Sequence, residues 1–125
     1  MVNLPNNKIA FELTQAGNVH IFTPEQVLAF YLRKLHEFYV KDDVTTKDIV
    51  LSIPSYATNT ERQALVDACD VAGFKCLRVI NESTAIVYNY GFFRKNDLSK
   101  ETERVVAFVD FGHSKTTVTI AGFKC

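Results

Sequence analysis

Asp110 stands at the end of a hydrophobic run, where its carboxylate could hold the metal ion of a metal–phosphate complex. The run Val105–Val109 reads as a strand, and a second β-like run, Thr116–Ala121, follows a polar turn that contains Gly112. This pattern predicts a β-hairpin whose tight turn presents backbone N–H groups, which suits an anion. A carboxylate at a strand end can hold a Mg²⁺-bound water or orient the attacking water in phosphoryl transfer. In the alternative interpretation, Asp110 only caps the following turn through its own side chain.

Four turn residues would face such a phosphate, namely Gly112, His113, Ser114 and Lys115. Glycine allows a positive φ and a close approach of the backbone to a ligand. The side chains of His113 and Ser114 restrict the backbone conformations that these residues can adopt, but the side chains could contact a phosphate directly. Lys115 could neutralise phosphate charge. The residues alone leave open the alternative that His113 and Lys115 are solvated turn residues.

Three further candidates stand where strands meet helices. Glu82 opens an expected helix directly after a strand, and the helix macrodipole by itself favours a carboxylate there. Pro54 ends an apolar strand, so a strand terminator is the simpler interpretation of that residue. Arg62 lies in the first turn of the next helix, where a cation is disfavoured, and we therefore expect it to have a partner carboxylate.

The elements that position these residues follow from hydrophobic periodicity and from turn and cap signals. Expected strands cover Lys8–Leu13, Asn18–Phe22, Asp48–Ile53 and Cys76–Ile80, and expected helices cover 24–40, 59–72 and 82–90. Gly73 and Gly91 are the expected helix stops. The strand Asp48–Ile53 is nearly continuous in apolar residues, which predicts that both of its faces are covered. Alternating strands and helices predict an α/β fold with a mixed sheet and flanking helices.

Several motifs in one order resemble the nucleotide-binding domain of the seventy-kilodalton heat-shock chaperones. The motifs are Ile53–Tyr56, Glu61–Ala64, Leu77–Ala85 and Asp110–Gly112. The resemblance covers nearly the whole chain and is most specific from about Asp48 onward. A sugar kinase of the same fold would also predict a phosphate hairpin, but it would not produce these motifs in this order.

Departures from that family pattern resemble its divergent 110-kilodalton branch. Gly112, His113 and Ser114 stand where the family has three glycines, and Ser83 stands where it has proline. The branch usually shows Asp-x-Gly-His-Ser and Asn-Tyr-Gly, and Asn89–Gly91 matches the second of these. Lys115 replaces a threonine whose hydroxyl helps catalysis in the family. We therefore expect a turn that binds nucleotide in the intact protein but hydrolyses it slowly.

The resemblance implies a partial actin-like, ribonuclease-H-like fold with nucleotide held between two lobes. Residues 1–93 would belong to the first lobe, 94–103 would connect the lobes, and 104–125 would form the first hairpin of the second lobe. It also implies roles for the candidates: Asp110 and Glu82 would be catalytic, with Asp110 holding a metal through water. Gly112 to Lys115 would bind ATP or ADP with Mg²⁺, while Pro54 and Arg62 would relay nucleotide state.

By this resemblance the parent protein is an ATP-binding chaperone or co-chaperone of the heat-shock type. Its partners would be unfolded client proteins and a second heat-shock chaperone on which it promotes nucleotide exchange. The sequence leaves open whether the parent hydrolyses ATP. We expect the chain alone to be inactive as an ATPase. If the nucleotide cleft requires both complete lobes, the chain alone binds no nucleotide. The alternative is an interaction or structural module of the same fold without nucleotide chemistry, whose open sheet edges favour self-association.

Composition argues against several further classes of function. The chain has 125 residues, about one domain, and its fourteen basic and fourteen acidic residues give a net charge of zero. The chain has no excess of basic residues that would indicate a nucleic-acid partner, and no apolar stretch approaches the roughly 20 residues of a membrane span. Three cysteines without a CxxC pattern favour a reducing compartment, so we expect a cytoplasmic protein. Cys125 directly follows a strand, which indicates that the sequence is part of a longer protein.

Overall fold

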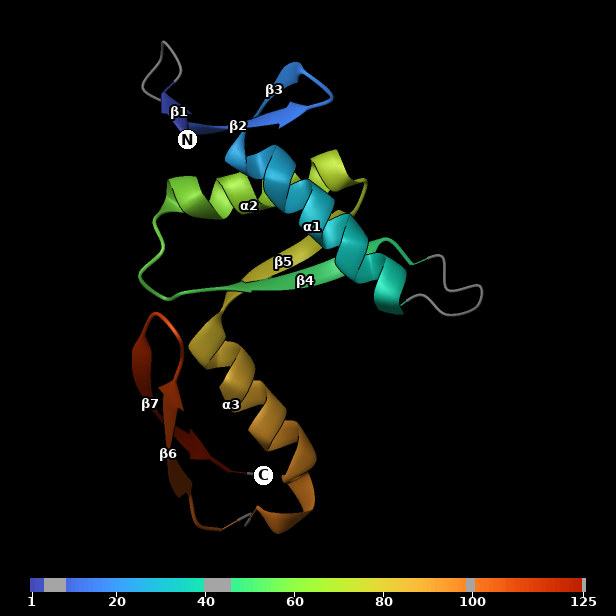
Figure 1. Ribbon diagram of the computed structural model, residues 1–125. Helices are drawn as coiled ribbons and strands as arrows, with labels where there is room; N and C mark the ends of the chain where they lie inside the picture. Colours follow the sequence, from blue (N-terminus) through green and yellow to red (C-terminus); the bar gives the residue numbers. More distant parts are fainter. Residues whose placement is uncertain (4–8, 40–45, 99–100, 125) are drawn as a thin grey trace. The chain divides into compact units, whose positions relative to one another are not determined.

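A computed structural model describes residues 1–3, 9–39, 46–98 and 101–124. The chain divides into two compact units, the first comprising Met1–Leu51 and Thr58–Val79, the second Ser52–Ala57 and Ile80–Cys125. The described strands form three small sheets, in the orders β1-β2-β3, β4-β5 and β6-β7 (Figure 1). Strands and helices alternate along the chain as the sequence predicts, and the α/β class is confirmed.

The first unit opens with a small antiparallel sheet. Its strands are β1 (Val2–Asn3), β2 (Ile9–Gln15) and β3 (Asn18–Phe22). The connection between β2 and β3 is a two-residue turn in which Ala16 and Gly17 both have positive φ, 51° and 81°. Such turns match the right-handed twist of the strands they join, which explains why a glycine marks the hairpin. The two-residue strand β1 was missed by the sequence reading.

Two capping boxes begin the helices of the first unit. Helix α1 (Pro24–Tyr39) follows Thr23, whose N–H donates to Gln26 Oε1 over 2.9 Å while its hydroxyl accepts from Gln26 N–H. Helix α2 (Asn59–Ala72) follows Thr58, which exchanges the same two kinds of bond with Glu61. Each box satisfies two backbone donors that a helix start otherwise leaves unpaired. Both starts were predicted, and the expected end of the first helix at Val40 lies outside the described residues.

The core of the first unit lies between its two helices and one face of a two-stranded sheet. Strands β4 (Asp48–Ile53) and β5 (Lys75–Asn81) run in the same direction (Figure 1). The buried cluster of Leu32, Cys69 and Phe74 packs against residues of both strands, including Ile49, Leu51 and Cys76. Residues of β4 alternate between half-buried and exposed, and Val50 is 52% exposed. The prediction that both faces of this strand are covered is therefore wrong, because α1 and α2 cover only the face that carries Ile49 and Leu51.

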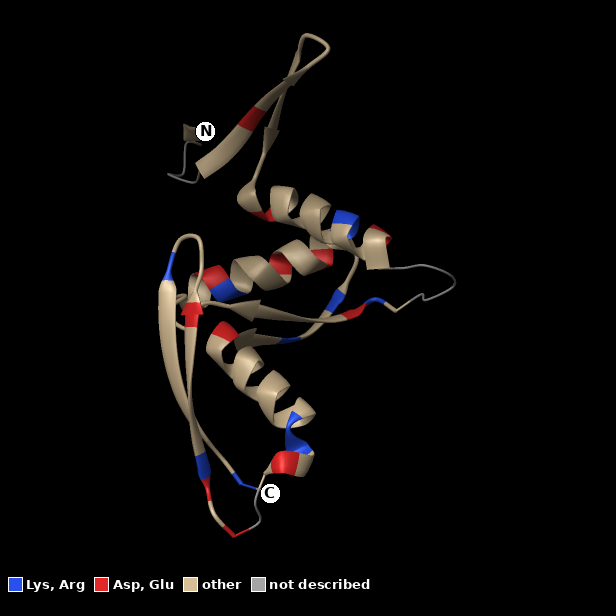
Figure 2. Cartoon of the chain, turned by 60° about the horizontal axis from the view of Figure 1, so that its bottom comes forward, with Lys and Arg blue, Asp and Glu red and all other residues tan. Residues whose placement is uncertain are grey.

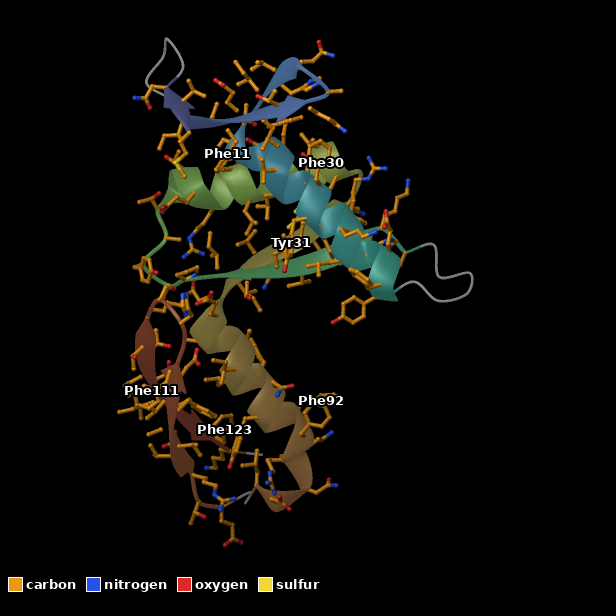
Figure 3. The ribbon with its side chains drawn as sticks, viewed as in Figure 1. Phe11, Phe30, Tyr31, Phe92, Phe111 and Phe123 are labelled. Carbon is orange, nitrogen blue, oxygen red and sulfur yellow. The ribbon has the colours of Figure 1, made fainter. Side chains whose placement is uncertain are left out.

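The second unit pairs one helix with one hairpin. Its elements are α3 (Glu82–Phe93), a 3₁₀ turn (Lys95–Asp97), β6 (Arg104–Phe111) and β7 (Thr116–Phe123). The register runs from Arg104 opposite Phe123 to Phe111 opposite Thr116. Phe123 lies between the hairpin and α3, whereas Phe111 lies on the far side of the hairpin (Figure 3). The ring of Phe123 contacts those of Tyr90 and Phe108, with centroids 5.1 and 6.2 Å away.

Gly91 does not stop the last helix, contrary to the sequence prediction. Helix α3 continues to Phe93. A Cβ at position 91 would lie 3.1 Å from Cε1 of Phe123, so this glycine permits close packing of the helix against β7. A packing glycine inside a helix looks like a stop signal in sequence because both uses need the missing side chain.

Among the described residues, no helix is long and apolar enough to cross a membrane.

Candidate functional site

Lys115 and Glu82 form an ion pair inside the second unit. The Lys115 ammonium donates to Glu82 Oε2, and the two side chains are 24% and 35% exposed. Lys115 is the last residue of the hairpin turn, and Glu82 is the first residue of α3. Figure 2 shows an acidic residue at the start of α3 and a basic residue beside the turn of the hairpin. The helix N-terminus also favours the negative charge of Glu82.

Strand register places Asp110 on the same face of the hairpin as this ion pair. Asp110 is opposite Thr117, and directly opposed residues of antiparallel strands point to the same face. Lys115 and Thr117 share a face because side chains alternate along an extended chain. The alternation continues to Phe123, whose buried ring packs on α3. Asp110 itself is exposed, at the end of that face near the turn.

A groove of about 520 Å³ lies beside the ion pair. One side is formed by Pro54, Ser55 and Tyr56, which follow β4. The rest is formed by the first two residues of α3, by the last turn residue and by the start of β7. These residues are Glu82, Ser83, Lys115, Thr116, Thr117, Val118, Thr119 and Ile120. The Lys115 ammonium lies 5.7 Å from the ring centroid of Tyr56. The groove thus combines one cation, one carboxylate, an aromatic ring and several hydroxyl groups.

The turn at residues 112–115 is closed by its own backbone. Gly112 N–H donates to Lys115 O over 2.8 Å. A Cβ at position 112 would lie only 3.0 Å from that oxygen, so a larger residue would push the turn backbone aside. Gly112 does not have the positive φ that the sequence suggested; Gly17 and Gly73 are the described glycines with positive φ. His113 and Ser114 are exposed on the turn.

The candidates identified from the sequence are therefore brought together only in part. Pro54, Glu82 and Lys115 line the groove, and Asp110 shares a face with Lys115. Arg62 belongs to α2 in the first unit, so its relay role stays a prediction. The sequence reading missed Tyr56, Thr117 and Thr119 as groove residues. The every-second-residue spacing of Thr117 and Thr119 after Lys115 was the available signal for the second and third of these.

The donor set is poor in direct metal ligands. Within the part of the chain that the structure describes, no three His, Cys, Asp or Glu side chains gather closely enough to form a metal cage. Mg²⁺ does not require one, because it usually keeps several waters and binds through one or two carboxylates together with substrate phosphates. The carboxylate of Glu82 already holds a cation, the Lys115 ammonium. The residues present therefore fit a hydrated metal–phosphate complex but not a metal held by protein alone.

Comparison with known proteins supplies the family. A family model described as "Hsp70 protein" matches residues 1–124. The chain is 42% identical over 128 residues to "Heat shock protein 110" of Caenorhabditis elegans, and 38% identical over 127 residues to the "97 kDa heat shock protein" of Mesocentrotus franciscanus. It is 40% identical over 128 residues to "Heat shock 70 kDa protein 4" of Rattus norvegicus.

Each of these alignments covers 98% of the chain, but the chain spans only 14 to 16% of the length of the curated relatives. The resemblance to the 110-kilodalton branch agrees with the first of them. The match is to the family in which the sequence motifs were recognised, and it extends over almost every residue. The chain belongs to the Hsp70 family.

Proposed function

We propose that this chain forms the phosphate-holding part of an ATP site in a heat-shock chaperone. The observation that carries the proposal is the Glu82–Lys115 ion pair beside the groove of the second unit. A cation and a carboxylate in contact present the two charges that a metal–phosphate complex requires. Membership of the Hsp70 family supports ATP with Mg²⁺ as that complex.

Each residue has a separate role in this proposal. Lys115 binds a phosphate oxygen as a compact positive charge. Glu82 and Asp110 hold the waters of a magnesium ion, because carboxylates bind Mg²⁺ directly or through its hydration shell. Gly112, His113 and Ser114 form the turn that faces the phosphates. When bound, the metal would neutralise charge on the phosphates.

The chain by itself is not proposed to hydrolyse ATP. Phosphoryl transfer depends on many positioned donors around the transferred group. Here one lysine, two carboxylates and one turn are the groups assigned to it. We propose that the complete cleft lies between two lobes. Residues 1–93 belong to the first lobe, residues 94–103 connect the lobes, and residues 104–125 begin the second lobe. Pro54, which lines the groove, and Arg62 in α2 would relay nucleotide state.

The cellular role follows from the family at a coarser level. We propose that the parent couples nucleotide state to the handling of unfolded proteins, or to nucleotide exchange on a partner heat-shock chaperone, in the cytoplasm. The heat-shock relatives support the class of partner. Equal numbers of acidic and basic residues offer no field for a nucleic acid.

One observation favours a second function, an interaction module without nucleotide chemistry. The outer face of the β6–β7 hairpin is apolar and open, with Val109 and Phe111 54% and 80% exposed. Val118 and Ile120, which also line the groove, are 65% and 71% exposed. Apolar faces of this kind mark interaction surfaces. Strand pairing between copies through the sheet edges would also satisfy the backbone N–H and C=O groups of the edge strands.

Calorimetric titration of Mg-ATP into the chain separates the two functions. The nucleotide site predicts binding near micromolar affinity, roughly −8 kcal/mol. Lys115→Gln should weaken it by about tenfold or more, since it removes a charge-assisted bond to phosphate. Lys124→Gln is the matched control, because it removes a lysine charge just after β7 outside the groove and should change nothing. No heat from the unaltered chain, together with a dimeric mass in solution, would instead favour the interaction module.

A further inference from the structure

The Lys115 ammonium is engaged by Glu82 before any ligand arrives. Its ion pair is more shielded from solvent than the exposed pairs Lys34–Glu37 and Arg94–Asp97, whose side chains are 52% to 65% exposed. Shielding reduces the screening of an ion pair by water and salt. The positive charge expected to attract a phosphate is therefore locally cancelled.

Neither a phosphate alone nor a divalent cation alone can replace the Glu82–Lys115 ion pair without leaving one of the two charges unpaired. A phosphate that took Lys115 would leave the partly buried Glu82 carboxylate unpaired beside a second negative charge, which is costly. A divalent cation that took Glu82 would in turn face the released ammonium. A complex that carries both signs replaces both halves of the ion pair at once, so that no charge is left unpaired.

We infer that Glu82 masks Lys115, so that this groove accepts a phosphate only together with a divalent cation. The inference rests on the proposed function and names what makes that site depend on metal. It is specific to a lysine at position 115, because the threonine that the family resemblance implies there has no charge to mask. Glu82 acts as an internal competitor of phosphate, and it releases Lys115 when its carboxylate is occupied by the metal.

The test is a ³¹P NMR titration of inorganic triphosphate, with and without MgCl₂, against the chain and its Glu82→Gln variant. Without Mg²⁺, Glu82→Gln should bind triphosphate about tenfold more tightly than the unaltered chain, since it frees a charge-assisted donor. With Mg²⁺, the unaltered chain should gain affinity and the variant should not. Asp97→Asn is the matched control, because it removes a carboxylate from the Arg94 ion pair outside the groove.

The gain must also depend on Lys115. The double variant Glu82→Gln/Lys115→Gln should bind no more tightly than Lys115→Gln alone. Amide NMR spectra of each variant verify that it is folded. Equal weakening of binding by Glu82→Gln with and without Mg²⁺ would show a merely structural role and overturn the inference.

The same data separate this inference from the proposed function. Mg-ATP binding by calorimetry without the Glu82→Gln gain would leave the nucleotide site intact and reject the masking. Failure of triphosphate to bind the unaltered chain with Mg²⁺, and the variant without it, would overturn the masking as well as the assignment of phosphate to this groove.

Discussion

The Lys115 ammonium donates to the Glu82 carboxylate and joins the hairpin turn to the first turn of α3. The two residues are 33 positions apart, so the bond fastens the two elements of the second unit together. Both side chains are about one-third exposed or less, which leaves the interaction less screened than a surface pair.

A double-mutant cycle should measure this coupling. Lys115→Gln, Glu82→Gln and the double variant, unfolded with urea, should give a coupling energy of about 1 kcal/mol that falls in high salt. The exposed pair Arg94–Asp97, 3.1 Å long, is the control and should give well under half of that. A coupling near zero for Lys115 and Glu82 would mean that the ion pair does not persist in solution.

Gly91 provides a second prediction. Alanine usually stabilises a helix interior by about 1 kcal/mol relative to glycine. Here the added Cβ would press on the Phe123 ring, which is 9% exposed and held by Tyr90 and Phe108. Gly91→Ala should therefore lower the free energy of unfolding, by roughly 1 kcal/mol.

The Phe123→Leu background supplies the control for this glycine. With the ring removed, the same Gly91→Ala change should become stabilising, as helix propensity alone requires. Chemical unfolding of the four proteins measures both steps. A stabilising Gly91→Ala in the unaltered chain would show that the ring moves freely and that close packing is not the reason for the glycine.

Stability should fall in alkaline solution because of Cys69. Burial, with a smaller contribution from the neighbouring Cys76, raises the pKa of the Cys69 thiol from 9.0 to about 11. The folded state therefore keeps a proton that the unfolded state has lost between these two pH values. The protonated Cys69 thiol contributes fully to the free energy of unfolding below pH 9. That contribution disappears as the pH rises through the folded pKa, and the free energy of unfolding falls by about 2 to 3 kcal/mol at most.

Urea unfolding between pH 8 and pH 11 measures the effect. The unaltered chain is compared with Cys69→Ala, which retains every other ionisable group, so that the difference between the two proteins reports on this thiol. The stability difference between the two proteins should shrink as the pH rises. Parallel curves would contradict the assignment of the alkaline loss to this thiol.

Local signals in the sequence predicted most of the elements correctly. The capping boxes at Thr23 and Thr58 are complete within four residues, and both helices begin where those residues indicate. Gly73 ends α2 with φ 83° in the left-handed region, as its position predicts. These features depend on neighbouring residues alone, so no knowledge of packing is required to find them.

Features that depend on distant partners were harder to foresee. Gly91 was misread because its role is set by Phe123, 32 positions later. Glu82 and Lys115 were both identified as candidates, yet their mutual pairing was not, because spacing in the sequence carries no signal for a contact across 33 positions. Gly112 was expected in the turn for its conformational freedom, but in the structure its φ is not positive, and the missing Cβ instead leaves room for Lys115 O; its contact with phosphate stays a prediction.

The most direct test of the phosphate groove is amide NMR mapping of the ¹⁵N-labelled chain during a titration with Mg-ATP. The proposal predicts concentration-dependent shifts for Tyr56, for Glu82 and Ser83, and for Lys115 through Thr119, all groove residues of the second unit. The β2–β3 hairpin of the first unit should stay unchanged. Shifts centred on the first unit, or none at saturating Mg-ATP, would contradict the assignment of the phosphate site to the Glu82–Lys115 groove.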